Sequence, residues 1–389
     1  MKKKFAGTGR RLSLWWSRLA AMSIKELLQL RRDPLLLAAI IYLFTVDIFM
    51  AGGVKMQLNN AMVAVHDADH SMASRELIYR FRPPYFKLRG EILDAHEGIR
   101  LLDSGEAMLV LDIPSQFQRD LIQGKTADVQ VQVDTSNSVL GFLASSYAGQ
   151  IIGQYSFDRA IERMGLTKES MGKMPMLVDQ HRVWYNPNQT DSWFMSISEM
   201  LTVITILSIM LPAAAAVREK ERGTIEQLLV SPLTPMQILL PKVISMTMVI
   251  LIGTAVSILL ILEPVFHVPI KGSLSLFFMV TVLYTFTTAG LGLFIATVSR
   301  NLAQVAMLTI LIMMPMIFLS GAWTPPEAMP AGLRQAMCLS PLYYYIEMSY
   351  GILLKGTRLN ILWDSLLGLT SLGILVFGFG VWRFRRQFE

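Results

Sequence analysis

The sequence predicts an α-helical integral membrane protein with six transmembrane helices and a large α/β domain between the first two. Two observations support this. Apolar runs long enough to cross a bilayer recur along the 389 residues, and one long polar stretch, residues 55–192, interrupts them. Hydrophobic residues make up 53% of the chain and charged residues only 16%, whereas a soluble domain carries about 25% charged residues. This composition is typical of a protein embedded in lipid.

A membrane-spanning helix needs about 20 apolar residues, and six segments reach or approach that length. They are Leu35–Val54, Phe194–Val217, Val243–Leu262, Leu274–Val298, Leu302–Leu319 and Ile361–Val381. Helices are expected because lipid offers no partner for backbone polar groups. The predicted parts are a tail at residues 1–34, the first span at 35–54, the polar domain at 55–192 and the remaining spans within 193–389.

Positive charges gather at one end of the alternating spans. They are Arg31, Arg32, Arg218, Lys220, Arg222, Lys242, Arg300, Arg383, Arg385 and Arg386. The positive-inside rule assigns that end to the cytoplasm. Both termini are then cytoplasmic, residues 55–192 are extracytoplasmic, and the expected location is the inner membrane. This assignment accounts for the net charge of +6, so no nucleic acid partner is expected.

The polar domain alternates strand-like and helix-like stretches, which predicts a small α/β unit. The predicted strands are Ala61–His66, Ala107–Ile113 and Asp128–Asp134. The predicted helices are Ser71–Arg82, Asp94–Asp103 and Ser115–Gln123, followed by a longer helix at Ser138–Met164. The run 129–133 alternates apolar and polar residues with period two, as a half-buried strand does.

The stretch Leu14–Arg32 before the first span mixes tryptophan and leucine with basic residues. That composition suits a helix lying in the membrane interface, in contact with lipid. A helix packed on the protein's own cytoplasmic face fits equally well. The first apolar run follows a polar and aromatic stretch, so it is expected to be a retained anchor and not a cleaved signal. The single cysteine, Cys338, excludes an intramolecular disulfide.

The loop after the second span begins with a dense cluster of charges, Arg218 to Arg222. Gly223 is expected to break the helix, and Thr224 to cap a short helix that Pro232 ends. A short helix at the membrane surface suits contact with a soluble partner. An ordinary solvated loop is the alternative.

The chain resembles the ABC-2 type transport permeases in four stretches that occur in the expected order. The first runs from Arg218 to Lys242, with Gly223-Thr224 followed by Glu226-Gln227-Leu228-Leu229. The others are Ala289–Arg300, Leu319–Pro330, and Ser340-Pro341-Leu342 with Gly351–Gly356. Leu240-Pro241-Lys242 departs from the Gly-Lys that the family often has there. The resemblance covers about residues 194–385 and is closest to the branch that exports drugs and lipids.

The resemblance implies a permease that pairs with a second copy or a paralogue and binds a separate ATPase at its cytoplasmic face, through a coupling loop at 218–242. The implied coupling residues are Arg218, Glu219, Glu221, Arg222, Gly223, Thr224 and Glu226, with a second contact at Arg31, Arg32 and Asp33. The outer domain is a candidate docking surface for a periplasmic adaptor.

No cofactor is expected on the chain itself. A phosphate-binding loop needs Gly-x4-Gly-Lys-Ser/Thr. The nearest match is Gly124-Lys125-Thr126, but Arg119 stands where the first glycine is required. ATP and Mg²⁺ are therefore expected on a partner polypeptide.

Ionisable and proline-rich positions suggest a substrate path or an outer gate. Residues 323–356 are too polar at their start to span, and two short re-entrant helices or an external loop both fit. The candidate residues are Asp47, Glu199, Glu263, Pro325, Pro326, Tyr343 and Tyr344. Intramembrane charges are functional candidates by default, although a position at the lipid–water interface also explains Glu263.

Two other function classes compete with transport. A membrane-embedded enzyme would need a catalytic set, and the nearest one is a metal site at His66, Asp67, Asp69 and His70, which a helix-capping turn explains as well. A sensor would bind a ligand in the outer domain and recruit a cytoplasmic partner without ATP. Transport of amphipathic or hydrophobic compounds is the preferred hypothesis.

Overall fold

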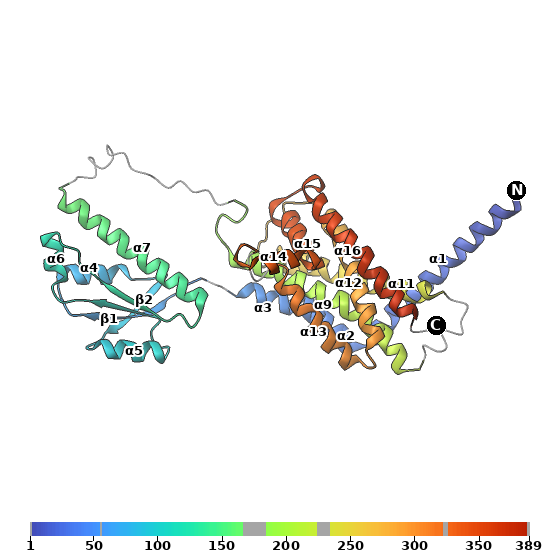
Figure 1. Cartoon of the computed structure of the whole chain (residues 1–389), viewed down its shortest axis with the longest axis horizontal. Helices are drawn as coiled ribbons and strands as arrows, with labels where there is room; N and C mark the ends of the chain where they lie inside the picture. The colour runs from blue at the N-terminus through green and yellow to red at the C-terminus, as the bar shows by residue number, and fades with distance from the viewer. Residues whose placement is uncertain (1, 55–56, 166–183, 224–233, 322–325, 387–389) are drawn as a thin grey trace. The chain divides into compact units, whose positions relative to one another are not determined.

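The computed structural model describes residues 2–54, 57–165, 184–223, 234–321 and 326–386 (Figure 1). The chain divides into two compact units. The helical unit comprises residues 1–54 and 183–389, and the α/β unit comprises residues 55–182.

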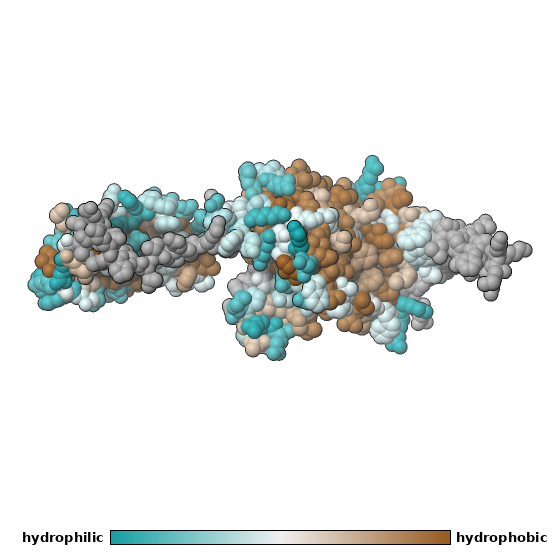
Figure 2. All heavy atoms as spheres, turned by 90° about the horizontal axis from the view of Figure 1, so that it is seen from above, coloured by the Kyte–Doolittle hydropathy of each residue, from teal (hydrophilic) through white to brown (hydrophobic). Residues whose placement is uncertain are grey.

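Five helical stretches of the described chain are long and apolar enough to cross a membrane. Three of them are single helices: α9 Asp191–Glu221, α12 Leu274–Val298 and α16 Leu359–Arg386. The stretch Pro34–Gly53 consists of α2 Pro34–Tyr42, the π-helix η1 Leu43–Asp47 and α3 Ile48–Gly53. The stretch Met236–Leu262 lies within α11 Pro235–Ser257 and the π-helix η2 Ile258–Leu262. The remaining predicted span forms α13 Leu302–Phe318, an apolar helix of 17 residues, at the short end of spanning lengths. In Figure 2 hydrophobic side chains cover much of the visible face of this unit.

α12 lies at the centre of the helical unit and packs most extensively against α16 and α9. Glycine permits this approach, because a Cβ at Gly292 would lie 2.3 Å from the carbonyl oxygen of Ile209. Small residues at such crossings let helix backbones come close together in membranes. α12 also meets Tyr345 of the later segment Pro341–Tyr350 (α15), where the rings of Tyr284 and Tyr345 stack with centroids 4.0 Å apart. The Tyr284 hydroxyl also pairs with the hydroxyl of Thr205 at 2.8 Å.

The N-terminal helix α1 runs from Lys2 to Arg31, beginning earlier than the predicted stretch. Its buried residues Leu19, Ser23, Glu26 and Leu30 recur at intervals of four, three and four, which places them on one helical face. That face packs on α11, where the Ser245 hydroxyl donates to the carbonyl of Ser23 at 2.9 Å. The other face exposes Trp16, Ile24 and Leu28. The helix therefore has one face packed on the protein and another free for lipid.

Short helices follow α13 in the region where re-entrant helices and an external loop both fitted the sequence. They are the 3₁₀ turn η3 Pro326–Ala328, α14 Ala331–Ala336, the 3₁₀ turn η4 Met337–Leu339, α15 Pro341–Tyr350 and the π-turn η5 Gly351–Lys355. α15 packs on α16 and α12, and Tyr345 is fully buried there.

The α/β unit is built on a four-stranded sheet in the order β2-β1-β3-β4. The strands are β1 Ala61–Asp67, β2 Phe86–Glu91, β3 Leu109–Ile113 and β4 Gln130–Val133. β1 pairs in parallel with β2 and β3, and β4 pairs antiparallel with β3. The helices are α4 Met72–Arg80, α5 Ala95–Asp103, α6 Phe117–Gln123 and α7 Ser138–Arg163.

The sheet has a core on each face because side chains alternate along a strand. Val63 and Val65 of β1 are buried in the core that also holds Leu77 of α4. Ala64 points the other way, into a smaller core with Leu101 of α5. Figure 1 shows α5 on one face and α4 and α7 on the other.

Strands β1, β3 and β4 and all four helices coincide with predicted stretches to within a few residues. β2 was not predicted. Its sequence, Phe86-Lys87-Leu88-Arg89-Gly90-Glu91, is charged and mostly exposed. Such charges are typical of edge strands, which they protect from pairing with another chain, and they weaken the apolar pattern by which a strand is predicted.

Candidate functional site

The end of α1, the start of α2 and the end of α9 meet at one end of the helical unit. α2 begins with Pro34, whose fixed φ suits the first turn of a helix. Asp33 caps it by accepting the N–H of Leu36 on Oδ1 at 3.1 Å. The other carboxylate oxygen, Oδ2, accepts Nη1 of Arg218 at 3.0 Å. Asp33 and Arg218 were assigned to two separate predicted contacts with the ATPase. In the structure an ion pair connects these two residues directly.

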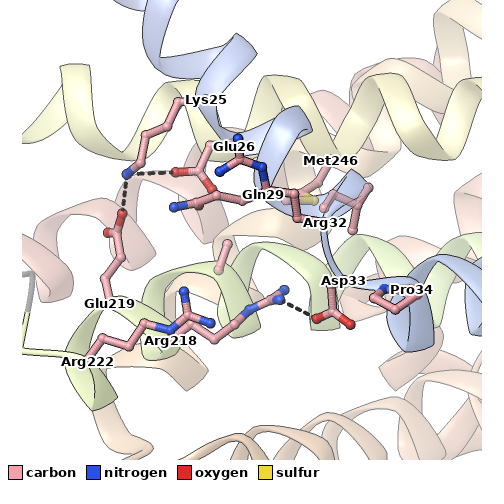
Figure 3. Close-up of a pocket in the computed structure, with 12 residues that line it drawn as sticks. Lys25, Glu26, Gln29, Arg32, Asp33, Pro34, Arg218, Glu219, Arg222 and Met246 are labelled. Carbon is pink, nitrogen blue, oxygen red and sulfur yellow. Dashed lines mark hydrogen bonds and ion pairs between the residues drawn. The ribbon is translucent and has the colours of Figure 1, made fainter.

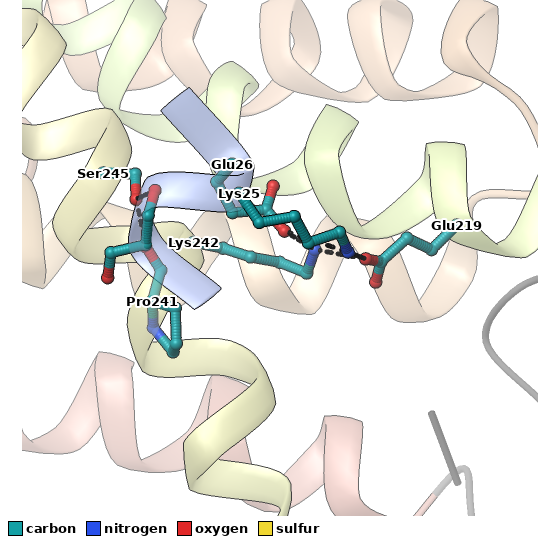
Figure 4. Close-up of polar contacts among 7 residues, drawn as sticks. Lys25, Glu26, Glu219, Pro241, Lys242 and Ser245 are labelled. Atoms are coloured by element: carbon teal, nitrogen blue, oxygen red, sulfur yellow. Dashed lines mark hydrogen bonds and ion pairs between the residues drawn. The ribbon is translucent and has the colours of Figure 1, made fainter. Parts of the chain in front are cut away.

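Beside this pair lies a buried charge cluster of Lys25, Glu26, Glu219 and Lys242 (Figure 4). The Lys242 amine lies 2.7 Å from Oε1 of Glu26 and 2.9 Å from Oε1 of Glu219. The Lys25 amine also reaches Oε1 of Glu219 at 3.0 Å. Two cations and two carboxylates thus link α1, α9 and α11.

Burial gives the cluster its importance. The Lys242 side chain is 1% exposed and that of Glu26 is 3% exposed. Removing one partner from such a buried ion pair leaves an uncompensated charge in low dielectric. Loss of any one of these charges would therefore disturb the contact among three helices.

The predicted coupling loop, 218–242, is shorter in the structure. α9 continues to Glu221, and α11 has already begun at Pro235. α9 extends past its apolar run, and the charged residues of its last turn have partners on or beside the neighbouring helices. The Lys220 amine donates to the carbonyl of Ala296 on α12, and Oε1 of Glu221 accepts the N–H of Leu302 at 3.1 Å, at the start of α13.

The remaining predicted coupling residues divide into two groups. Arg31, Arg32 and Arg222 are exposed, and Gly223 takes a positive φ of 65° just after α9. Thr224 and Glu226, together with the predicted short helix, lie outside the described residues.

A polar cavity of about 600 Å³ opens between these elements (Figure 3). Its lining includes Glu26, Arg32 and Asp33 from the α1–α2 junction and Arg218, Glu219 and Arg222 from the end of α9. In Figure 3 the side chains of Arg218 and Asp33 point toward one another across it.

Nearer the opposite ends of the spans, Asp47 and Glu199 form a second pair of predicted residues. Asp47 ends the π-helix η1, and Glu199 lies on α9. Their side chains lie close enough to interact electrostatically. π-helical turns inside longer helices often occur at functional sites. Glu263 is exposed immediately after η2.

The predicted outer-gate residues are partly brought together. Pro326 and Tyr343 line one cavity of about 320 Å³. Tyr344 stacks edge-on against Tyr343, with ring centroids 5.2 Å apart, and donates its hydroxyl to the carbonyl of Cys338 at 3.1 Å. Pro325 lies outside the described residues.

The predicted metal cluster in the α/β unit is divided among separate contacts. His66 pairs with Asp112 at 2.8 Å, and Asp69 accepts the N–H groups of Gln116 and Gln118. Within the described residues, Asp67 and His70 do come together with Glu91 in metal-ligating range.

The same residues also take part in a hydrogen-bonded turn. Both carboxylate oxygens of Asp67 already accept hydrogen bonds, Oδ1 from the N–H of His70 and Oδ2 from the hydroxyl of Ser74. The guanidinium of Arg75 donates to the carbonyl of His70. These contacts match the helix-capping turn that was the alternative interpretation.

Three residues of the buried charge cluster were not among the site residues predicted from the sequence: Lys25, Glu26 and Lys242. The available signal was a charge within an apolar stretch. Glu26 falls on the apolar face of α1, and Lys242 lies within the apolar run of α11. Such a charge is rare unless it is paired, but the sequence does not identify its partner.

Comparisons with known proteins agree with the resemblance drawn from motifs. Residues 34–382 match the family model described as ABC-2 family transporter protein. The chain is 34% identical over 366 residues to "Inner membrane transport permease YhhJ" of Escherichia coli (strain K12), which covers 94% of this chain and 96% of that protein.

Two further relatives come from the same organism. "Probable multidrug ABC transporter permease YbhR" is 31% identical over 352 residues, with 90% of this chain and 93% of the relative covered. "Probable multidrug ABC transporter permease YbhS" is 28% identical over 386 residues, with 97% and 99% covered. With its several long apolar helices, the chain is a multi-pass inner-membrane protein.

Proposed function

The chain belongs to the ABC-2 family of transporter proteins, and on that premise we propose that it is the permease subunit of an ATP-driven exporter. The energy would come from a separate ATPase subunit that carries ATP and Mg²⁺. This subunit would bind the arginine-rich end of the helical unit, where Arg31, Arg32, Arg218 and Arg222 lie. The compounds moved would be amphipathic or hydrophobic, as the multidrug names of two relatives suggest. A second copy or a paralogue would complete the transport path.

The observation that carries the proposal is the buried charge cluster. A partner pressing on α1 or on the end of α9 would push on helices that Lys242 connects to α11, through ion pairs of 2.7 and 2.9 Å. The displacement would then pass into α9 and α11, both long enough to span the membrane. Arg31 is exposed at the end of α1 and is available for contact.

The proposal includes an orientation. This end of the helical unit would lie in the cytoplasm, and the basic residues at the ends of the spans support that orientation through the positive-inside rule. The α/β unit would then lie in the periplasm, where an adaptor could dock on it. Asp47 and Glu199 would lie nearer the periplasmic ends of their helices and line part of the substrate path.

The test is co-purification from the native host in mild detergent, asking whether an ABC ATPase accompanies the chain in fixed ratio. The variant Arg31→Glu with Glu226→Lys changes two predicted contact residues without changing the net charge. We expect it to release the ATPase and to abolish ATP-dependent export.

The matched control is Arg358→Glu with Asp364→Lys, an equally balanced exchange at exposed positions near the start of α16. It should retain the ATPase. If no ATPase accompanies an intact wild-type protein, the exporter has no energy source. The sensor hypothesis, which requires no ATP, would then replace it.

A further inference from the structure

A second, apolar cavity adjoins the polar cavity at the arginine-rich end of the helical unit. This apolar groove has a volume of about 240 Å³. It lies between α2 and α11, where Leu37, Ile41, Val249 and Ile252 form part of its walls. Ile41 and Ile252 remain 56% and 62% exposed, so the groove is open on the side that would face lipid.

The two cavities are neighbours along the same helices. Leu30, in the last turn of α1, lines both of them. On α11, Met246 lines the polar cavity and Val249 lines the groove, and residues three apart lie one above the other on a helix. On α2, Pro34 and Leu37 have the same relation. A molecule with a polar head and an apolar tail could therefore occupy both.

The charges around the polar cavity leave a positive surplus. In the buried charge cluster two lysines balance two glutamates, and Arg218 is paired with Asp33. Arg32 and Arg222 also line the cavity, and within the described part of the chain no acidic side chain lies within ion-pair distance of either. Two arginines are thus available for a phosphate, whose geometry the guanidinium fork matches.

We propose that the polar cavity and the apolar groove together bind one anionic phospholipid. Its phosphate contacts Arg32 and Arg222, and one acyl chain lies in the groove between α2 and α11. The phosphate would lie at the depth of the lipid headgroups, because Asp33 and Pro34 mark the change from the polar α1 to the apolar α2. Basic pockets between membrane helices at this level are suited to lipid headgroups. The lipid would act as a structural ligand beside the buried charge cluster.

The test uses the full-length protein in detergent, with phosphatidylglycerol and phosphatidylcholine of identical acyl chains added in turn. Bound lipid is counted by native mass spectrometry. We expect phosphatidylglycerol to be retained preferentially. Arg32→Gln and Arg222→Gln should each weaken its binding about fivefold, the worth of one basic residue near an anionic headgroup. Arg300→Gln removes an exposed arginine outside the site and should change nothing.

The acyl chain has its own variant. Ile252→Trp should fill the groove and reduce retention, whereas Leu259→Trp, at an equally exposed position outside the groove, should not. Arg32→Lys keeps the charge and should retain most of the binding, which separates loss of charge from misfolding.

Three results would overturn the proposal. The first is equal retention of both lipids. The second is a loss in the arginine variants no greater than in Arg300→Gln. The third is full competition by glycerol 3-phosphate with no effect of Ile252→Trp, which would identify a free-phosphate site. None of these readouts requires an ATPase or transport, so the proposed function is tested separately.

Discussion

The two units of this protein use the same ion-pair chemistry in opposite environments. In the helical unit, Lys242 and Glu26 meet with 1% and 3% of their side chains exposed. In the α/β unit, Arg89 and Glu106 pair with 37% and 56% exposed. The first pair is removed from water, whereas the second is about half exposed to it.

This difference in exposure determines how much stability is lost when one charge of a pair is removed. An exposed pair contributes about 0–1 kcal/mol, because water screens it and its side chains lose freedom. A buried pair gains little overall, but breaking it costs much more, because a lone charge is left in low dielectric. The α/β unit therefore depends on its two apolar cores, whereas the helical unit also depends on a polar cluster that must remain complete.

The largest expected effect comes from Lys242→Met, which leaves Glu26 and Glu219 buried with reduced compensation. We expect the free energy of unfolding to fall by about 3–5 kcal/mol, measured by chemical denaturation in detergent. The matched control is Lys25→Met, because the Lys25 side chain is 39% exposed and its loss should cost far less. Equal losses in the two variants would break the comparison.

A second effect concerns close packing of the helical unit. Gly292→Val places a Cβ 2.3 Å from the carbonyl oxygen of Ile209 and should separate α12 from α9. We expect a loss of about 1–3 kcal/mol, the usual cost of overpacking, seen as a lower melting temperature in the same detergent. Gly378→Val on α16 is the control, since nothing lies within 4 Å of its added Cβ. If the control loses as much, close backbone contact is not the cause.

A smaller, pH-dependent effect is expected in the α/β unit. Burial acts to raise the pKa of Asp69, but hydrogen bonds from Ser71 and from the backbone of Gln118 and Gln116 outweigh it and lower this pKa below its ordinary value. A carboxylate with a lowered pKa stabilises the fold above its unfolded pKa of about 4. That contribution is lost as the pH falls through the lowered value.

Asp69→Asn should therefore be less stable than wild type at pH 7. Its free energy of unfolding should be lower by at most about 1 kcal/mol, because solvent screens the charge. The gap between variant and wild type should close as the pH is lowered below 4, which calorimetry of the full chain measures. A gap that stays constant with pH would show that the charge of Asp69 does not matter.

The smallest effect is expected for Arg89→Gln at the exposed pair. The free energy of unfolding should change by less than about 1 kcal/mol, and 0.5 M salt should remove even that difference because it screens exposed charges. A loss as large as that of Lys242→Met would show that exposure does not separate the two kinds of pair.

Local features of the fold could be predicted because they depend on neighbouring residues alone. Apolar runs of spanning length marked the helices, and period-two alternation marked strands such as β4, predicted at Asp128–Asp134 and observed at Gln130–Val133. β2 was missed because an edge strand with Lys87, Arg89 and Glu91 has no apolar periodicity. The end of α9 was misjudged where terminal charges have partners on or beside neighbouring helices, as at Lys220 and Glu221.

For the candidate site, the sequence by itself determined where the charges lie along the chain, and it singled out Asp33, Arg218 and Glu219. Only the tertiary structure decided which of them meet. Glu26 and Lys242 are 216 residues apart, and their contact exists because α1 packs on α11. Hydropathy and charge patterns record which face of a helix is apolar, but not which helix covers it. The partners of a buried charge are therefore fixed by the packing of distant segments.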